Sequence, residues 1–317
     1  MTAAPAGPGG SPARRLLGRI AAAGWRGAVV PVCRLADLDD AIRERWERGE
    51  IDDALYHAAL AALARGAAAA WPRARSVVVV AVPTPPVRLV FRWRGRNVPV
   101  TVPPTYVGYT ARTTTTQDAL AAWLREDGWA LARPSLALKT LAVRSGLAAY
   151  GRNNVTYVPE MGSFLQLVGG VTDLPCDGDP WREPVALDRC ASCVACARRC
   201  PTGAIADDRF LIRAERCLTY HNEATADFPG WIDPSWHHCL VGCMRCQTAC
   251  PANRAFRDWH EDRGAFDEDE TAALLGRVRL EELPPATAAK LRGLELNEDY
   301  GALCRNLGAL LYRDSAV

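Results

Sequence analysis

The chain has 317 residues, of which 49% are hydrophobic and 23% are charged, so it can bury a sizeable core and is not globally disordered. Its 38 Lys and Arg against 36 Asp and Glu leave a net charge of +2, which by itself indicates neither a nucleic-acid nor a membrane partner. The unusual feature is the set of twelve Cys, because ten of them lie between Cys176 and Cys250. Such clustering in a chain of this length favours bound metal over a disulfide framework.

The N-terminal residues give no signal for export or for a membrane span. Residues 1–12 are small and rich in Pro and Gly, which predicts a disordered tail. Arg14 and Arg15 resemble the start of a twin-arginine export signal, but Arg19 and Arg26 interrupt the apolar segment that follows, so an amphipathic first helix is favoured. No run reaches the ~18 apolar residues of a membrane span. We therefore expect a cytoplasmic protein without a membrane partner.

Helices and strands alternate through the first half of the chain. The valine-rich run 76–82 predicts a buried strand, and VRLVFRWRGRNVPVTV predicts a hairpin that turns at Gly95. Two more strands, over 154–159 and 164–172, are expected to be joined by a turn at Gly162. Helical patterns cover 13–24, 36–48, 52–66, 116–129 and 136–147. This alternation predicts an α/β sandwich.

The composition changes after Pro175 to Pro, Asp, Trp and Cys with little periodicity, which places a domain boundary near residue 180. We expect a disordered tail over 1–12, an α/β domain over 13–180, a metal-binding domain over 181–260 and a helical segment over 261–317 that packs back on the core. We expect a monomer.

The Cys spacing indicates iron–sulfur clusters. Cys190, Cys193, Cys196 and Cys200, the last followed by Pro201, form the C-x2-C-x2-C-x3-C-P run of bacterial ferredoxins. In such runs three thiolates bind one [4Fe–4S] cluster and the fourth binds another. The alternative is a zinc site, but zinc ribbons usually pair two C-x2-C units across a long gap.

A partial second copy of this run follows. Cys243, Cys246 and Cys250 have the matching spacing, but the usual first ligand two residues ahead is missing. By the cross-over pattern, Cys190, Cys193, Cys196 and Cys250 would hold one cluster. Cys200, Cys243, Cys246 and a fourth ligand would hold the other. Two candidates for the fourth ligand remain, Cys217 and Cys239, although three residues between Cys239 and Cys243 are one too many for the usual loop.

Several segments together resemble the epoxyqueuosine reductase family and, more distantly, the catalytic part of reductive dehalogenases. They are LALKTLAVRSGLAAYGRNNVTYVPEMGSFLQLVGGVTDLP, CASCVACARRCPTGAI, ERCLTYH, GCMRCQTACPANR and the terminal CRNLGALL. The resemblance implies that Cys217 is the fourth ligand and that the α/β domain is nitroreductase-like and carries cobalamin. It also implies an oxidoreductase in which a ferredoxin or flavodoxin reduces the clusters.

The resemblance also suggests residues for the cofactor and the chemistry. The turn around AYGRNN, with Gly151, Arg152 and Asn153, is expected to approach the corrin ring, as are Gly162 and Ser163. Lys139 and Tyr150 are the candidate proton donors, and burial would lower the pKa of a Lys beside a cationic metal. For Lys139 the alternative is an ordinary surface position.

One departure from the family affects the expected substrate. The family's proton-donating Asp precedes the 136–147 helix, but the corresponding stretch here, residues 130–135, has no carboxylate. The helical-repeat tail that grips tRNA in longer members is also missing from the sequence. We therefore expect a small-molecule substrate in preference to epoxyqueuosine in tRNA. The alternatives are an epoxyqueuosine reductase, a non-catalytic electron-transfer protein and a flavin reductase.

His237, His238 and His260 are three further candidate ligands. The stretch from Asp258 to Gly264 is similar to a cobalamin-binding D-x-H-x-x-G element, but its Gly is one residue late, so His260 is expected to be solvated. His237 and His238 adjoin Cys239, where we favour a structural role.

Overall fold

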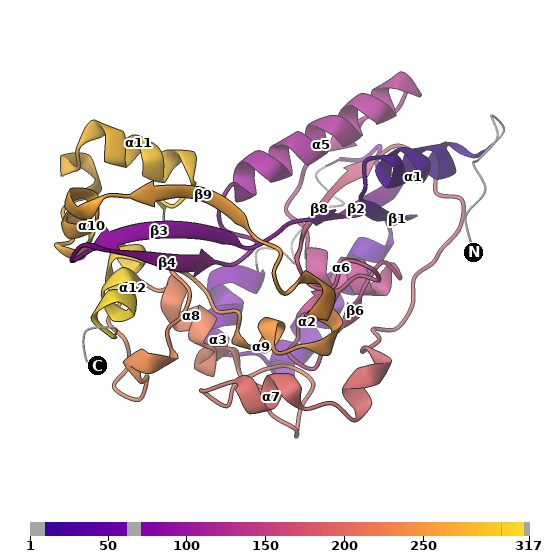
Figure 1. The fold of residues 1–317 in the computed structure, drawn as a ribbon. Coiled ribbons are helices and arrows are strands. Elements are labelled where there is room, and N and C mark those ends of the chain that lie inside the picture. The colour runs from indigo at the N-terminus through magenta and orange to yellow at the C-terminus, as the bar shows by residue number, and fades with distance from the viewer. Residues whose placement is uncertain (1–9, 62–70, 299, 314–317) are drawn as a thin grey trace. The chain divides into compact units, whose positions relative to one another are not determined.

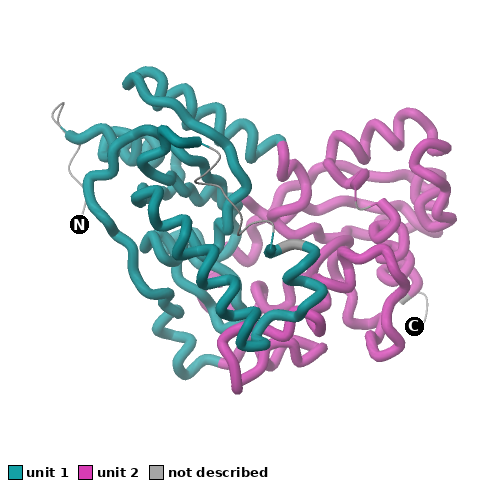
Figure 2. The backbone as a smooth tube through the Cα atoms, turned by 180° about the vertical axis from the view of Figure 1, so that it is seen from behind, with its two compact units in different colours: residues 1–83, 111–193 teal, residues 84–110, 194–317 magenta. Residues whose placement is uncertain are grey.

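The computed structural model describes residues 10–61, 71–298 and 300–313. The chain forms two compact units, one made of residues 1–83 and 111–193 and the other of residues 84–110 and 194–317 (Figure 2). The predicted hairpin thus belongs to the second unit, although the strand just before it belongs to the first. The domain limits drawn from composition stay a prediction. Among the described residues, no helix is both long enough and apolar enough to cross a membrane.

A four-stranded sheet organises the first unit, in the order β1-β2-β8-β5 with antiparallel pairing throughout (Figure 1). Its strands are β1 (Arg26–Pro31), β2 (Ser76–Pro83), β5 (Leu131–Ala132) and β8 (Leu165–Thr172). The valine-rich run predicted as a buried strand is β2, and seven of its eight residues are buried. β1, which was not predicted from the sequence, pairs with the outer edge of β2 from Arg26 to Pro31.

Alternate residues of β2 enter two hydrophobic layers, as the two-residue period of a strand requires. Val77, Val79 and Ala81 pack with α2 (Arg34–Glu47) and α6 (Leu138–Arg144). Val78, Val80 and Val82 pack with α1 (Pro12–Ala22) and α5 (Tyr109–Glu126) on the other face. Helices therefore cover both faces of the sheet, and the predicted α/β class is confirmed.

Two consecutive glycines let β8 run close to its neighbours. A Cβ on Gly169 would lie 2.9 Å from the carbonyl oxygen of Val78, and one on Gly170 would lie 2.8 Å from that of Ala132. Both contacts are with backbone atoms, which cannot move aside easily. Any side chain at these positions would therefore force the strands apart.

The first helix begins earlier than expected. Ser11 caps α1 by accepting a hydrogen bond from the Arg14 amide at 3.3 Å, and Pro12 occupies the first turn. Residues 11 and 12 of the predicted tail are thus ordered, while residues 1–9 lie outside the described residues. The predicted helix over 52–66 starts with α3 (Asp53–Leu55) and a π-helical turn, η1 (Tyr56–Leu60). Its last five residues, 62–66, are also not among those described.

A second sheet, in the order β4-β3-β9, forms the core of the second unit with three helices. The predicted hairpin consists of β3 (Val87–Trp93) and β4 (Arg96–Val102), and it turns at Arg94 and Gly95, which have φ values of 52° and 72°. β9 (Glu261–Phe266) runs parallel to β3, and Phe266 stacks on Phe91 with ring centroids 4.8 Å apart. The helices are α10 (Glu268–Leu275), α11 (Pro285–Gly293) and α12 (Tyr300–Arg313).

Short elements make up the rest of the described chain. β6 (Ala149–Tyr150) pairs with β7 (Thr156–Tyr157), so the strand predicted over 154–159 is only two residues long. The remaining elements are η2 (Asp188–Ala191), α7 (Ala195–Arg199), η3 (Ala214–Arg216), α8 (Leu218–Glu223), η4 (Pro234–Trp236), α9 (Arg245–Thr248), η5 (Pro251–Phe256) and η6 (Leu280–Glu282).

Candidate metal centre

The two Cys-rich runs have the same backbone conformation. α7 follows Val194 with φ −120° and ψ 17°, and α9 follows Met244 with φ −117° and ψ 3°. Each helix leads to an extended Cys followed by Pro, with ψ 110° at Cys200 and 126° at Cys250. The partial repeat in the sequence is therefore also a repeat in structure, and α7 and α9 pack against each other.

All twelve Cys are free thiols, and the four predicted ligands of the second cluster, Cys200, Cys217, Cys243 and Cys246, all lie in the second unit. Burial raises the pKa of Cys217, and the charge of Cys200 raises it further. Burial likewise raises the pKa of Cys243 to about 12, with smaller contributions from Cys239 and Cys217. Because a ligand must be a thiolate, loading iron at these buried positions must displace protons.

A single zinc ion would need its ligands close together. Zinc–sulfur bonds of about 2.3 Å would bring four thiolates to within about 4 Å of one another. Across the part of the chain that the structure describes, no three Cys, His, Asp or Glu side chains are grouped closely enough to hold one metal ion. A [4Fe–4S] cubane holds its four thiolate ligands further apart, because each is bound to a different iron.

Hydrogen bonds around Cys217 offset part of the effect of burial. Cys217 ends η3 and is the N-terminal cap of α8. Its sulfur accepts hydrogen bonds from the backbone and hydroxyl of Thr219 and from the backbone of Tyr220, and these bonds lower the pKa against the effect of burial. Amide hydrogens directed at sulfur also tune the potential of an iron–sulfur cluster.

The rival ligand, Cys239, has different surroundings. It is fully buried, which raises the pKa of its thiol to about 12, and its backbone forms a bridge with Thr101 of β4. Its charge influences Cys243, whereas Cys217 is coupled to both Cys243 and Cys200. Because Cys217 is coupled to two other predicted ligands of the second cluster, these interactions support it as the fourth ligand. The assignment stays a prediction.

Helix α12 supplies contacts that the sequence did not lead us to expect. The Asn306 amide donates to the carbonyls of Asn222 and Leu240, both at 2.8 Å, and Asn222 donates to the carbonyl of Gly242 at 2.7 Å. Arg305 donates to the carbonyls of His221, at 2.8 Å, and Ala226. These bonds hold the chain that follows Cys217 and the chain that precedes Cys243. The terminal CRNLGALL segment was the one available signal.

The His residues have structural contacts. His238 accepts a hydrogen bond from the Met244 amide at 3.1 Å through Nε2, and its Nδ1 lies 3.4 Å from the carbonyl of Trp236. It thereby orients the residue that starts α9. His237 is fully buried, and its ring centroid lies 4.2 Å from that of Phe228. His260 is exposed.

The two predicted proton donors lie in different environments of the first unit. Tyr150 is buried, which raises the pKa of its phenol, and its hydroxyl lies 3.3 Å from that of Thr140. Lys139 is exposed, with Nζ 3.3 Å from the Asn154 side-chain oxygen. The burial that was expected to lower the pKa of Lys139 is therefore not found.

The residues predicted to contact a corrin are packed against the protein itself. A Cβ on Gly151 would lie 2.5 Å from both Asn153 Oδ1 and Tyr157 Cε2. Asn153 is buried and donates to the Tyr157 hydroxyl at 3.0 Å. Gly162 is a buried turn residue with φ 61°, and Ser163 is also buried. Arg152 donates two hydrogen bonds to the backbone of the first Cys run.

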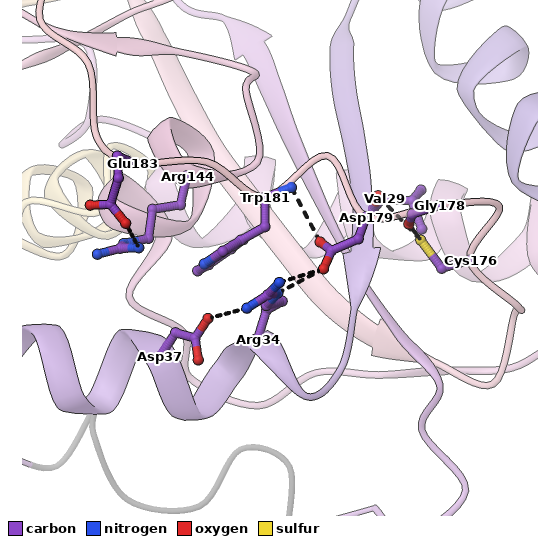
Figure 3. A network of polar contacts seen from close by, with 9 residues as sticks. All are labelled: Val29, Arg34, Asp37, Arg144, Cys176, Gly178, Asp179, Trp181 and Glu183. Carbon is purple, nitrogen blue, oxygen red and sulfur yellow. Dashed lines mark hydrogen bonds and ion pairs between the residues drawn. The ribbon is translucent and has the colours of Figure 1, made fainter.

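A polar network attaches the irregular segment before that run to the α/β unit (Figure 3). Arg34 of α2 donates to Asp179 at 2.6 Å and to Asp37 at 2.8 Å. The hydrogen bond from Arg34 holds the pKa of Asp179 below its usual value. Trp181 lies near the guanidinium groups of both Arg34 and Arg144, at 5.9 and 5.7 Å. The segment thus keeps a defined path without regular secondary structure.

Comparison with known proteins supports this site. Residues 189–253 match a 4Fe-4S double cluster binding domain, so the chain carries a domain for two [4Fe–4S] clusters. Epoxyqueuosine reductases from Bacillus subtilis and Escherichia coli are 32% and 35% identical over 122 and 117 residues. These alignments cover 38% and 37% of this chain but only 30% of each relative.

Solved structures show the fold over nearly the whole chain. Epoxyqueuosine reductase from Bacillus subtilis matches with a TM-score of 0.68 and 19% identity over 96% of this chain and 82% of that one. An epoxyqueuosine reductase crystallised with an epoxyqueuosine-modified tRNA-Tyr stem loop matches with a TM-score of 0.67 and 20% identity. The match covers 96% of this chain and 82% of that one. The predicted resemblance is confirmed. Reductive dehalogenases match with a TM-score of only 0.37, which carries no argument.

These findings correct the expected substrate. We preferred a small molecule to epoxyqueuosine in tRNA because residues 130–135 lack a carboxylate. The relatives are instead epoxyqueuosine reductases, one of them solved with the modified tRNA stem loop, and they favour the alternative. A positioned acid contributes a rate factor of about 10²–10⁴, and another group can provide it. One missing side chain was therefore too narrow a basis for excluding the substrate.

The assignment of the fourth ligand predicts different outcomes for two substitutions. Cys217→Ala should lower the iron content of anaerobically reconstituted protein from about eight to about four atoms per chain. Cys239→Ala, which removes a fully buried thiol that also influences Cys243, should leave about eight. Iron and acid-labile sulfide analysis measures both, and the reverse pattern would refute Cys217 as the ligand.

Proposed function

We propose that the protein is an epoxyqueuosine reductase that acts on epoxyqueuosine-modified tRNA. The observation that carries the proposal is the combination of a two-cluster Cys domain with an epoxyqueuosine reductase fold over 96% of the chain. Each feature alone has other uses, since double clusters also occur in simple electron carriers and folds host many functions. Together they indicate an oxidoreductase in which the clusters deliver electrons.

The reaction's electron demand suits two clusters. Conversion of the epoxide to an alkene consumes two electrons and two protons and releases the oxygen as water. A [4Fe–4S] cluster passes one electron at a time, so two clusters can store one reducing pair. In this proposal a ferredoxin or flavodoxin in the cytoplasm supplies those electrons.

The proton must come from a group other than the family's Asp. Of the two donors suggested by the sequence, Lys139 is exposed and can meet a bound substrate. Tyr150 has its hydroxyl beside Thr140 in the buried core, where a large substrate has no access. We therefore propose Lys139 as the donor, held by its contact with Asn154.

Cobalamin belongs to the proposal only as a cofactor suggested by resemblance. The side chains of Asn153 and Arg152 bond within the protein, to Tyr157 and to the Cys run, so the backbone of this turn at Gly151 would face a corrin. When bound, a corrinoid would supply a strongly nucleophilic reduced cobalt.

Complementation tests the activity directly. Expression of this chain in a bacterial strain that lacks its own epoxyqueuosine reductase should restore queuosine in hydrolysed tRNA. Cys193→Ser, which removes a predicted cluster ligand, should restore none. If the normal chain accumulates with its clusters loaded but only epoxyqueuosine is found, the proposed function is wrong and a plain electron-transfer role is supported.

A rate assay with purified protein tests whether Lys139 donates the proton. With purified protein and a modified tRNA stem loop, Lys139→Met should slow the reaction by about 10²-fold or more, the usual contribution of a general acid. Arg133→Met is the matched control, because it removes a nearby exposed cation that pairs with Asp118 at 2.6 Å. Equal rates for the two variants would remove Lys139 from the mechanism.

A spectrum of anaerobically purified protein supplied with cobalamin examines the cofactor. Corrin bands that stay with the chain through gel filtration, beside the broad iron–sulfur absorption, are expected if the proposal holds. A chain that restores queuosine but retains no corrinoid would reject cobalamin and leave the reductase assignment in place.

A further inference from the structure

The segment around Gly151 runs beside the chain that enters the first Cys run. The Tyr150 amide donates to the carbonyl of Val185 at 2.9 Å, and the Leu187 amide donates to the carbonyl of Tyr150 at 2.8 Å. Tyr150 and Ala186 thus form a parallel bridge. Three residues after Leu187 comes Cys190, so β6 sets the position at which the run begins.

Arg152 extends this attachment into the run itself. Its Nε donates to the carbonyl of Cys193 at 3.0 Å, and its Nη2 donates to the carbonyl of Cys190 at 2.7 Å. Both acceptors are residues predicted to ligate the first cluster, and all three residues lie in the first unit. Arg152 is half-buried, so water screens its charge less than that of a fully exposed Arg.

The guanidinium is suited to this position in two ways. Its donors form a rigid planar fork that can hold two carbonyls at once, and hydrogen bonds from a charged donor are stronger than neutral ones. The guanidinium also carries a positive charge. The loop therefore has a positive charge hydrogen-bonded to the backbone of two of its predicted ligands.

We propose that Arg152 is a positioning residue of the first cluster, which fixes the Cys190–Cys193 loop and raises the reduction potential of the cluster bound there. Reduction adds negative charge to a cluster that already has four thiolate ligands, and a nearby cation stabilises the reduced form. This role goes beyond the proposed function, because it concerns electron transfer within the protein and holds for any substrate.

A redox titration followed by electron paramagnetic resonance tests the proposal on the full chain with both clusters reconstituted. In Arg152→Met, one of the two midpoint potentials should become more negative by about 59 mV or more, which is a tenfold change in the ratio of reduced to oxidised cluster for one electron. The other midpoint and the iron content should match the normal protein. Arg152→Lys should shift the same midpoint by less, because the charge stays but the fork is lost.

Arg189→Met is the matched control, since Arg189 adjoins Cys190 but is exposed. It should leave both midpoints unchanged. Arg152→Met protein with both clusters and unaltered midpoints would overturn the proposal. If Arg152→Met loses a cluster, Arg152→Lys decides: a lowered midpoint supports the role, and unchanged midpoints with full iron content overturn it. No tRNA is needed, so the result is independent of the proposed reaction.

Discussion

Eight thiolates must be held in fixed places by a part of the chain that has almost no regular structure of its own. The helices between Cys190 and Cys250 have four to six residues, whereas isolated helices below about 12–15 residues are marginal in water. Binding of a metal centre is coupled to folding in such segments, because ligands that are spread out in the unfolded chain gain their arrangement from the metal. The clusters are therefore structural as well as redox groups.

The protein around them satisfies backbone groups that short turns leave open. Asn306 and Arg305 of α12 bind carbonyls in the chain between Cys217 and Cys243, and Arg152 binds two carbonyls in the run of the first cluster. A buried polar side chain destabilises the folded protein unless it is hydrogen-bonded. These side chains are paired with carbonyls, so they stabilise the backbone beside the Cys loops. Gly242, with φ 63°, adds a backbone turn that leaves no room for a side chain beside Tyr106.

Strong local patterns made much of the fold predictable. The valines of β2 and the hairpin at Gly95 are where the sequence placed them, because β-branched runs and a turn glycine decide local conformation. β9, by contrast, has the sequence EDRGAF, which gives no strand signal. It becomes a strand through its pairing with β3, a contact about 170 residues away in sequence that no local pattern encodes.

In the candidate site, too, local sequence patterns were predictable and contacts between distant residues were not. The Cys spacing alone predicted two clusters, because ligand geometry fixes the intervals along the chain. The contacts of Arg152, Asn222 and Asn306 depend on which carbonyls they meet, and those partners are 20 to 84 residues distant. The substrate was misjudged because a single missing carboxylate outweighed the similarity of the whole segment.

The central claim is that this chain binds two cubane clusters through eight of its Cys. Iron and acid-labile sulfide analysis of the anaerobically reconstituted protein, combined with Mössbauer spectroscopy, tests it most directly. The account predicts about eight iron and eight sulfide per chain, all in [4Fe–4S] form. An iron content near four, or a protein that holds only zinc and resists reconstitution, would contradict it.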